Sequence, residues 1–181
     1  MDAIETDFGT FAEAADGTVT LRYERIYPRP IGTVWSAITE PERIADWLGV
    51  ADLEPHVGGR FEVRVGPGGR VPIIGKVLAW EPPSVLACAW AWPGGTAGVI
   101  RYELSPAGAQ ATRLVFTHTG LPQDQKASVL PGWHLYLERL GQALEGGRPE
   151  PDFSARHAEV RALYGRHYGT EATVCQPAEA V

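Results

Sequence analysis

One amphipathic helix near the C-terminal end of the sequence constrains the fold more than any other feature. Residues 128–145, SVLPGWHLYLERLGQALE, carry apolar side chains at steps of one, three or four. At about 100° per residue, this spacing gathers the side chains on one buried helical face. Because the face carries a Trp and a Tyr, it needs a broad apolar partner. Its members are Val129, Leu130, Trp133, Tyr136, Leu137, Leu140 and Leu144.

Other residues define the opposite side of this helix and its end. His134 and Glu138 fall on the polar side, where Leu135 is the apolar exception. Gly146-Gly147 predicts the C-terminal end, because the residue after a helix often adopts a left-handed conformation that glycine tolerates best. Pro131 has no N–H to donate, so it predicts a kink or the start of the second part of the helix.

The expected partner is a series of short strands. In residues 19–27, and again from Gly59 onward, apolar and polar residues alternate with a period of two, which is typical of half-buried strands. Glycine- and proline-rich turns between the runs indicate an antiparallel sheet with one apolar face. The sequence thus predicts an α+β fold with about six strands packed on the long helix. These strands cover residues 19–27, 60–65, 71–80, 85–92, 100–104 and 113–118.

Two short helices are expected after the first strand. Apolar spacing indicates a helix over residues 31–39, and Pro41 suits the first turn of a second helix that ends at Gly49. Residues 50–59 read as a loop. Trp47 therefore has two interpretations: it packs the second helix onto the core, or it gates a cavity whose mouth includes that loop.

The remaining residues flank a single domain. We expect residues 1–18 to form an N-terminal lead-in, residues 19–146 the domain and residues 147–181 a C-terminal extension. Within the extension, residues 153–168 show the spacing of one more helix. The tail from Thr170 has little to bury and is expected to be disordered.

Composition excludes several classes of partner. Among 181 residues the net charge is −6 and no long Lys/Arg run occurs, so nucleic acid is not an expected partner. The acidic N-terminus lacks the features of a signal peptide, and no apolar run approaches the roughly 18 residues needed for membrane insertion. Cys88 and Cys175 form neither a metal-ligand spacing nor a disulfide framework. We expect a cytoplasmic monomer or homodimer.

No metal or cofactor is predicted, because the five histidines show none of the spacings typical of metal ligands. Alternation places one of them, His118, on the inner face of its strand. It is either a core histidine with a backbone or hydroxyl partner, or a polar group that orients a ligand. Because imidazole titrates near neutral pH, His118 is also the one weak candidate for a general acid or base.

A surplus of aromatic rings marks the same inner face. Each ring alone is explained by core packing, but large rings leave irregular space between a curved sheet and a single helix, and buried indole and phenol groups require partners. We therefore predict an apolar cavity between helix and sheet. Its predicted ligand-binding residues are Trp47, Phe61, Trp90, Trp92, Tyr102, Phe116, His118, Trp133 and Tyr136.

A series of motifs follows the order of a known family. They are Arg22-Tyr-Glu-Arg25, Pro30 with Val34-Trp35-Ser-Ala-Ile-Thr39, Pro41-Glu with Trp47-Leu48, Val57-Gly-Gly-Arg-Phe61, Gly75-Lys-Val77, Pro82-Pro83, Trp90, Thr117-His-Thr-Gly-Leu121 and Gly132-Trp133-His134. Together they resemble the START-like (SRPBCC) superfamily, in the bacterial group similar to the C-terminal domain of the Hsp90 ATPase activator. The resemblance covers residues 19–146 and implies a helix-grip (START/Bet v 1-like) fold, in which the sheet curves around the long helix and encloses a cavity.

The resemblance also implies a choice of functions, since one fold hosts many activities. Relatives bind lipids, hormones or polyketide-like molecules, some catalyse cyclisation or dehydration, and one branch captures enediyne toxins. The Hsp90 activator engages its chaperone with an additional N-terminal domain, for which residues 1–18 leave no room. We expect binding or sequestration of a hydrophobic small molecule, lipid-like or polyketide-like. The alternatives are a cyclase or dehydratase using His118, a stress- or chaperone-related interaction module, and toxin self-resistance by capture.

Overall fold

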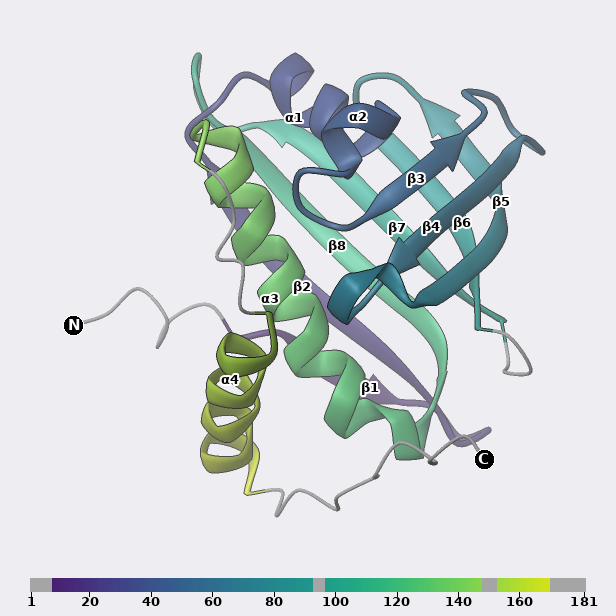
Figure 1. Cartoon of the computed structure of the whole chain (residues 1–181), viewed down its shortest axis with the longest axis vertical. Coiled ribbons are helices and arrows are strands. Elements are labelled where there is room, and N and C mark those ends of the chain that lie inside the picture. Colours follow the sequence, from purple (N-terminus) through teal and green to yellow (C-terminus); the bar gives the residue numbers. More distant parts are fainter. Residues whose placement is uncertain (1–7, 93–96, 148–152, 170–181) are drawn as a thin grey trace.

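The computed structural model describes residues 8–92, 97–147 and 153–169. One antiparallel sheet of eight strands curves around a long helix (Figure 1). The strand order is β1-β2-β8-β7-β6-β5-β4-β3. The strands are β1 (Thr10–Glu13), β2 (Thr18–Tyr27), β3 (Val50–Leu53), β4 (Arg60–Val65), β5 (Val71–Glu81), β6 (Val85–Ala91), β7 (Ala97–Pro106) and β8 (Thr112–Pro122).

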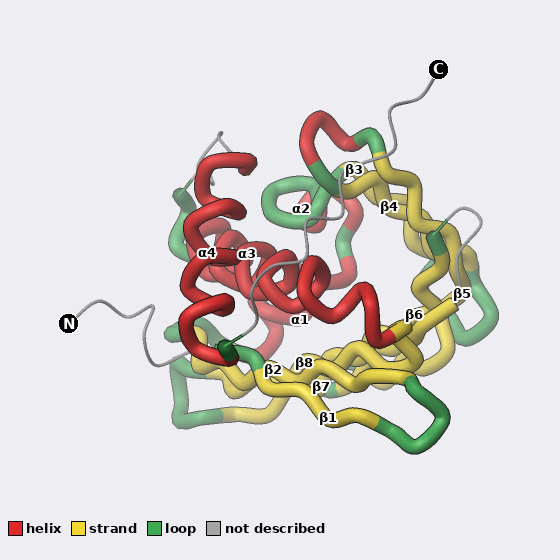
Figure 2. The backbone as a smooth tube through the Cα atoms, turned by 90° about the horizontal axis from the view of Figure 1, so that it is seen from below, coloured by secondary structure: helices red, strands yellow, loops and turns green. Residues whose placement is uncertain are grey.

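Four α-helices accompany the sheet in the described part of the chain. They are α1 (Ile31–Thr39), α2 (Pro41–Ile44), α3 (Lys126–Leu144) and α4 (Phe153–Tyr168). Seen from below, α3 lies against the concave face of the sheet and α4 runs beside α3 (Figure 2). The α+β fold predicted from the sequence, with a long C-terminal helix and two short helices after the first long strand, is confirmed.

The predicted number of strands is wrong, because the sheet has eight strands where about six were expected. The two additional strands, β1 and β3, form the two edges of the sheet. Each has only four residues; β1 has no buried residue and β3 has one, Leu53. An edge strand this short buries too few side chains to show a clear alternation. β3 therefore lies in the segment expected to be a loop, and β1 lies in the expected lead-in.

Strand β2 holds α3 in place through its side chains. The hydroxyl of Tyr27 donates a hydrogen bond of 2.9 Å to the carbonyl of Leu137, and that of Tyr23 donates to the carbonyl of Leu130. Just after β2, the guanidinium of Arg29 donates to the carbonyl of Leu144, an orphan acceptor at the helix end. The helix axis is thus fixed along one side of the sheet.

The helix α3 runs without interruption through Pro131, so this proline does not divide it. Its C-terminal end agrees with the expected glycine stop. Gly146 has a left-handed φ of 80°, and the N–H of Gly147 donates to the carbonyl of Gln142 at 2.9 Å.

The polar side assigned to α3 is in fact partly buried. His134 and Leu135 are 4% and 3% exposed. The cause is α4, which packs along this side and donates two hydrogen bonds from the Arg156 guanidinium to the Glu138 carboxylate, at 2.8 and 3.3 Å. The hydroxyl of Tyr164 lies 3.0 Å from Nδ1 of His134. A helix with two covered sides cannot be recognised from one apolar stripe.

Candidate ligand-binding cavity

A cavity of about 220 Å³ lies between the first half of α3 and the end of the sheet formed by β4, β5 and β6. Its walls are mostly apolar and aromatic. The lining residues are Val65, Gly66, Val71, Trp90, Trp92, Ser128, Val129, Gly132, Trp133, Tyr136 and His157. Tyr27 of β2 and the following Arg29 hold α3 near the opposite side of the curved sheet (Figure 2).

Helix α3 contributes one continuous wall. Its lining residues begin at Ser128 and end at Tyr136, which at 1.5 Å per residue spans about 12 Å along the helix. In the middle of this wall stands Gly132. A Cβ atom added to Gly132 would meet no atom within 4 Å, so the missing side chain leaves open space. The cavity is therefore elongated along the helix.

Aromatic rings form the opposite and inner walls. The ring centroid of Trp90 lies 5.0 Å from that of Trp133 and 6.1 Å from that of Trp92. The ring of Tyr136 lies 5.8 Å from Trp133, edge to face. Its hydroxyl accepts a hydrogen bond of 2.9 Å from the N–H of Gly66, which ties α3 to the end of β4. These contacts set the rings in fixed, tilted orientations around the space.

His118 lies behind this wall. It is fully buried and its Nδ1 accepts a hydrogen bond of 2.9 Å from the indole Nε1 of Trp133. Burial lowers the pKa of His118 to about 3, so the imidazole is neutral at pH 7. Since Nδ1 accepts, the proton of the neutral ring resides on Nε2. His118 thus acts on the cavity through Trp133, whose ring it orients.

Two buried N–H groups beside the cavity have no hydrogen-bond acceptor among the described residues: Nε1 of Trp90 and Nε2 of His118. Both atoms are covered by protein atoms, and the two rings meet edge to face with centroids 6.0 Å apart. An unpartnered buried donor costs about 1–3 kcal/mol. Neither atom faces the open space in this arrangement, so neither provides a ready contact for a ligand.

The structure brings together four of the nine predicted ligand-binding residues: Trp90, Trp92, Trp133 and Tyr136 line the cavity. The other five occupy the core and are not among its lining residues. Trp47 packs α2 onto α1 and donates its Nε1–H to the carbonyl of Ala37 at 2.9 Å. Phe61, Tyr102, Phe116 and His118 are buried between the sheet and α3.

Sequence reasoning did not predict the lining residues Gly132 and His157. A glycine within a helix has no side chain and so gives no apolar signal. Its low helix propensity is the one sequence feature that indicates a special role for this position. His157 belongs to α4, which begins at Phe153, whereas α3 ends at Leu144. A link between His157 and the cavity could be found only from the packing of the two helices.

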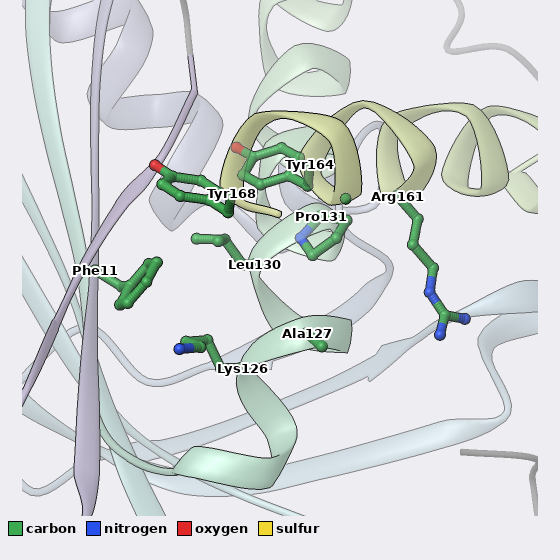
Figure 3. Close-up of a pocket in the computed structure, with 9 residues that line it drawn as sticks. Phe11, Lys126, Ala127, Leu130, Pro131, Arg161, Tyr164 and Tyr168 are labelled. Carbon is green, nitrogen blue, oxygen red and sulfur yellow. The ribbon is translucent and has the colours of Figure 1, made fainter. Parts of the chain in front are cut away.

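Two other hollows differ from this cavity. One lies at the contact between β1, α3 and α4, beside Phe11, Leu130 and Tyr168 (Figure 3). Its volume of about 30 Å³ is far smaller than the 220 Å³ of the aromatic cavity. The other is a groove of about 190 Å³ on the outer face of β3, β4 and β5, with charged residues such as Asp52 and Arg64 among its walls. Neither combines size with an apolar lining.

The described residues offer no other obvious site. Among them, His, Cys, Asp and Glu side chains form no group of three or more that could hold a metal ion. Within the same ranges, no helix is both long and apolar enough to cross a membrane. Burial raises the pKa of the Cys88 thiol to about 12, so this cysteine is an inert core residue. The second cysteine, Cys175, lies outside the described residues.

A curved antiparallel sheet that grips a long helix, with an aromatic cavity between them, defines the helix-grip class. Within this class, the family model described as Activator of Hsp90 ATPase homolog 1-like protein matches residues 28–145. The chain belongs to this family, which confirms the resemblance predicted from the motifs. The match ends before α4, so His157 lies outside the family region. The comparison with curated proteins gives no significant match.

Solved structures share the fold. The crystal structure of CalU16 from Micromonospora echinospora matches with a TM-score of 0.73 at 23% identity, over 91% of this chain and 99% of CalU16. The protein encoded by BPP1335 of Bordetella parapertussis matches with a TM-score of 0.67 at 26% identity, over 99% and 100% of the two chains. DynU16, a protein of the dynemicin biosynthetic locus, matches with a TM-score of 0.64 at 29% identity, over 72% of this chain and 48% of DynU16.

Proposed function

We propose that this protein binds or sequesters a hydrophobic small molecule in the cavity beside α3. The observation that carries the proposal is the open space of about 220 Å³ next to Gly132. Protein interiors are otherwise close-packed, and an unfilled apolar space costs stability. A bound apolar molecule would recover the contacts that the empty walls lack.

The glycine itself supports this function. Glycine inside a helix is less favourable than alanine by about 0.5–1 kcal/mol. At a second glycine of α3, Gly141, an added Cβ would lie 3.4 Å from the Tyr27 ring, in van der Waals contact with it. Gly132 has no such neighbour. The chain thus forgoes helix stability at a position that borders the cavity.

The dimensions limit the class of ligand. Ligand pockets commonly measure about 300–1,000 Å³, so this cavity suits a small ring system or one end of a larger molecule. Walls made of three indole rings and one phenol ring favour flat, ring-bearing molecules, because aromatic faces stack on them. The location of DynU16 in the dynemicin biosynthetic locus supports a natural product of the polyketide-like kind. Capture of such a molecule for self-resistance would use the same binding step.

Catalysis by His118 receives no support from the geometry. A general acid or base must come within hydrogen-bond reach of the reacting atom. Nδ1 of His118 is occupied by Trp133, Nε2 is covered by protein atoms, and the lowered pKa removes proton exchange near neutral pH. Binding therefore ranks before a cyclase or dehydratase activity.

A cavity-filling variant tests the proposal. The neutral probe N-phenyl-1-naphthylamine is expected to bind the wild-type protein, with increased probe emission and quenched tryptophan emission. Gly132→Leu places a side chain in the open space and should weaken this binding at least tenfold, while helix propensity keeps the fold intact. The matched control is Gly32→Leu, at an exposed position of α1 where an added Cβ also meets nothing.

The two variants distinguish the cavity from the rest of the surface. Gly32→Leu should bind the probe as the wild type does, since α1 contributes no residue to the cavity. Equal binding by the wild type and Gly132→Leu would overturn the proposal. So would the failure of the wild-type protein to bind any member of a panel of neutral aromatic probes.

A further inference from the structure

The groove on the outer face of the sheet is formed by β3, β4 and β5, which lie side by side at one end of the sheet (Figure 1). Between its outward residues, Val63 and Ile73 alternate inward and are buried. The groove therefore lies on the side of the sheet opposite the cavity beside α3. The strand register arranges its outward side chains in two rows, Asp52-Glu62-Ile74 and Val50-Arg64-Pro72.

Two apolar side chains of the groove are unusually exposed. Val50 is 70% exposed and Ile74 is 56% exposed, and both line the groove. Exposed apolar residues that share one face with charged residues are typical of protein contact surfaces. A groove of about 190 Å³ with charged walls thus suits the side chains of another protein better than it suits an apolar small molecule.

The charged residues of the outer face are unevenly paired. On β7, Arg101 and Glu103 stand two residues apart and form an ion pair of 2.9 Å. Strand β4 carries the same two residue types at the same spacing, as Glu62 and Arg64. Neither of them forms a side-chain hydrogen bond or ion pair with another residue in the described ranges. Two neighbouring opposite charges are thus left for a second molecule.

We propose that this face joins two copies of the chain. The two-fold axis lies in the plane of the contact, at right angles to β4, and crosses this strand between Glu62 and Arg64. Rotation about the axis exchanges the two rows. Glu62 of each copy then faces Arg64 of the other, and Ile74 faces Pro72 of the other. A two-fold contact uses the same surface on both copies, and this surface is complementary to itself in charge and in apolar character.

The third position of each row is compatible with the same contact. Asp52 would face Val50 of the other copy, but the charge of Asp52 is already compensated by its ion pair with Arg60. Six side chains from each copy make a small contact, and small contacts support weak, reversible association. The dimer is therefore expected to depend on protein concentration.

Neighbouring registers fit less well. An axis through Glu62 would set Arg64 opposite Arg60 of the other copy, and like charges repel. An axis between Arg60 and Glu62 would set the exposed Ile74 opposite Lys76 of the other copy. Of these three registers, only the proposed one places opposite charges together and apolar side chains together.

Sedimentation velocity of the full chain tests the proposal, at low ionic strength and from about 10 μM to about 1 mM, the range of weak association. The wild-type protein should change from monomer to dimer as its concentration rises. Glu62→Arg places like charges opposite each other at two symmetric positions, and Arg64→Glu does the same with the opposite sign. Each variant should raise the dissociation constant of the dimer at least about tenfold.

Mixing the two variants gives the sharpest result. In an equimolar mixture of Glu62→Arg and Arg64→Glu, every altered side chain faces an opposite charge of the other variant, so dimers should form again. The double variant, which exchanges the two charges within one chain, should dimerise by itself. A nonspecific effect of net charge on association does not produce this pattern.

The matched controls are Glu103→Arg and Arg101→Glu on β7. Glu103 pairs in register with Val85, at the opposite end of β6 from the neighbour of Ile74, so both controls should dimerise as the wild type does. Circular dichroism and thermal melting confirm that each variant is folded.

Three results would overturn the proposal. The first is a wild-type protein that stays monomeric over the whole concentration range. The second is a dimer that persists unchanged in both single variants, since it would use another surface, such as the edge of β3. The third is a mixture of the two variants that fails to dimerise, because Glu62 and Arg64 of different copies would then not face each other.

Discussion

The indole Nε1 of Trp133 donates a hydrogen bond to Nδ1 of His118, with 2.9 Å between the two nitrogens. This bond joins the long helix to the interior strand β8 and fixes the ring that forms the inner wall of the cavity. The ring of Phe116 adds a tilted contact, with its centroid 4.3 Å from that of Trp133. Packing and hydrogen bonding thus determine the orientation of one wall.

The first prediction concerns the strength of this coupling. In a double-mutant cycle of Trp133→Phe and His118→Leu, the two changes in unfolding free energy should fail to add by about 0.5–1.5 kcal/mol, the usual net contribution of a hydrogen bond. Denaturant unfolding of the four proteins measures this term. The pair His118→Leu and Trp47→Phe, which share no hydrogen bond, should add within about 0.5 kcal/mol. Additivity in the first pair would contradict the coupling.

Two parts of the fold could be predicted from the sequence for clear physical reasons. The apolar stripe of α3 and the alternation in the long strands both follow from burial of one face against the other. Tyr136 and Trp133 were thereby placed correctly between helix and sheet. The short edge strands and the burial of His134 were not predicted, because both depend on contacts with residues that are distant in the sequence.

The location of the cavity could not be predicted from the same patterns. Alternation identifies every inward-facing residue, but it does not distinguish Tyr102, which is packed in the core, from Trp90, which borders open space. That distinction depends on where the sheet separates from α3, which is set by the contacts of Tyr23, Tyr27 and Arg29 with the helix. A sequence pattern of period two contains no information on this separation.

The second prediction concerns acid stability. Burial lowers the pKa of His118 to about 3 and that of His134 to about 4, from an ordinary value of 6.5; at His134, Arg25 and Arg156 contribute further. Between pH 6.5 and these values the unfolded chain binds more protons than the folded chain, so the unfolding free energy falls as the pH falls. This stability is fully present above about pH 6.5.

Urea unfolding between about pH 7.5 and pH 5 measures the effect. Each histidine should contribute a loss of about 2 kcal/mol between pH 6.5 and pH 5. This window lies above the range in which Glu24 contributes, because hydrogen bonds from Arg113 and Arg22 lower the pKa of Glu24 to about 2. His134→Gln should flatten the profile. A profile that is flat in the wild type would contradict the buried neutral state.

The third prediction distinguishes the two interpretations of Trp47. The side chain is 1% exposed and its Nε1 is paired with Ala37, so Trp47→Ala should lower the unfolding free energy by about 3–5 kcal/mol. Stopped-flow mixing with N-phenyl-1-naphthylamine checks the alternative. If the variant keeps its stability but changes the rates of probe association and dissociation, Trp47 gates the cavity and the packing interpretation is wrong.

The last prediction concerns the open position in α3. Gly132→Ala should raise the unfolding free energy by about 0.5–1 kcal/mol, because alanine is the better helix former and its methyl group meets no atom within 4 Å. At the same time, the methyl group enters the cavity, so the affinity for N-phenyl-1-naphthylamine should fall. Stability and binding would then change in opposite directions, as expected where a protein gives up stability for a functional site.

Gly141→Ala provides the contrast within the same helix. The gain in helix propensity is similar, and the new methyl group would lie 3.4 Å from the Tyr27 ring, in van der Waals contact, so the variant should also be stabilised. Gly141 does not line the cavity, and probe affinity should remain at the wild-type value. Thermal unfolding and probe titration of the three proteins measure both quantities. A Gly132→Ala variant that is destabilised, or that binds the probe more tightly, would show that the space beside Gly132 is not kept open for a ligand.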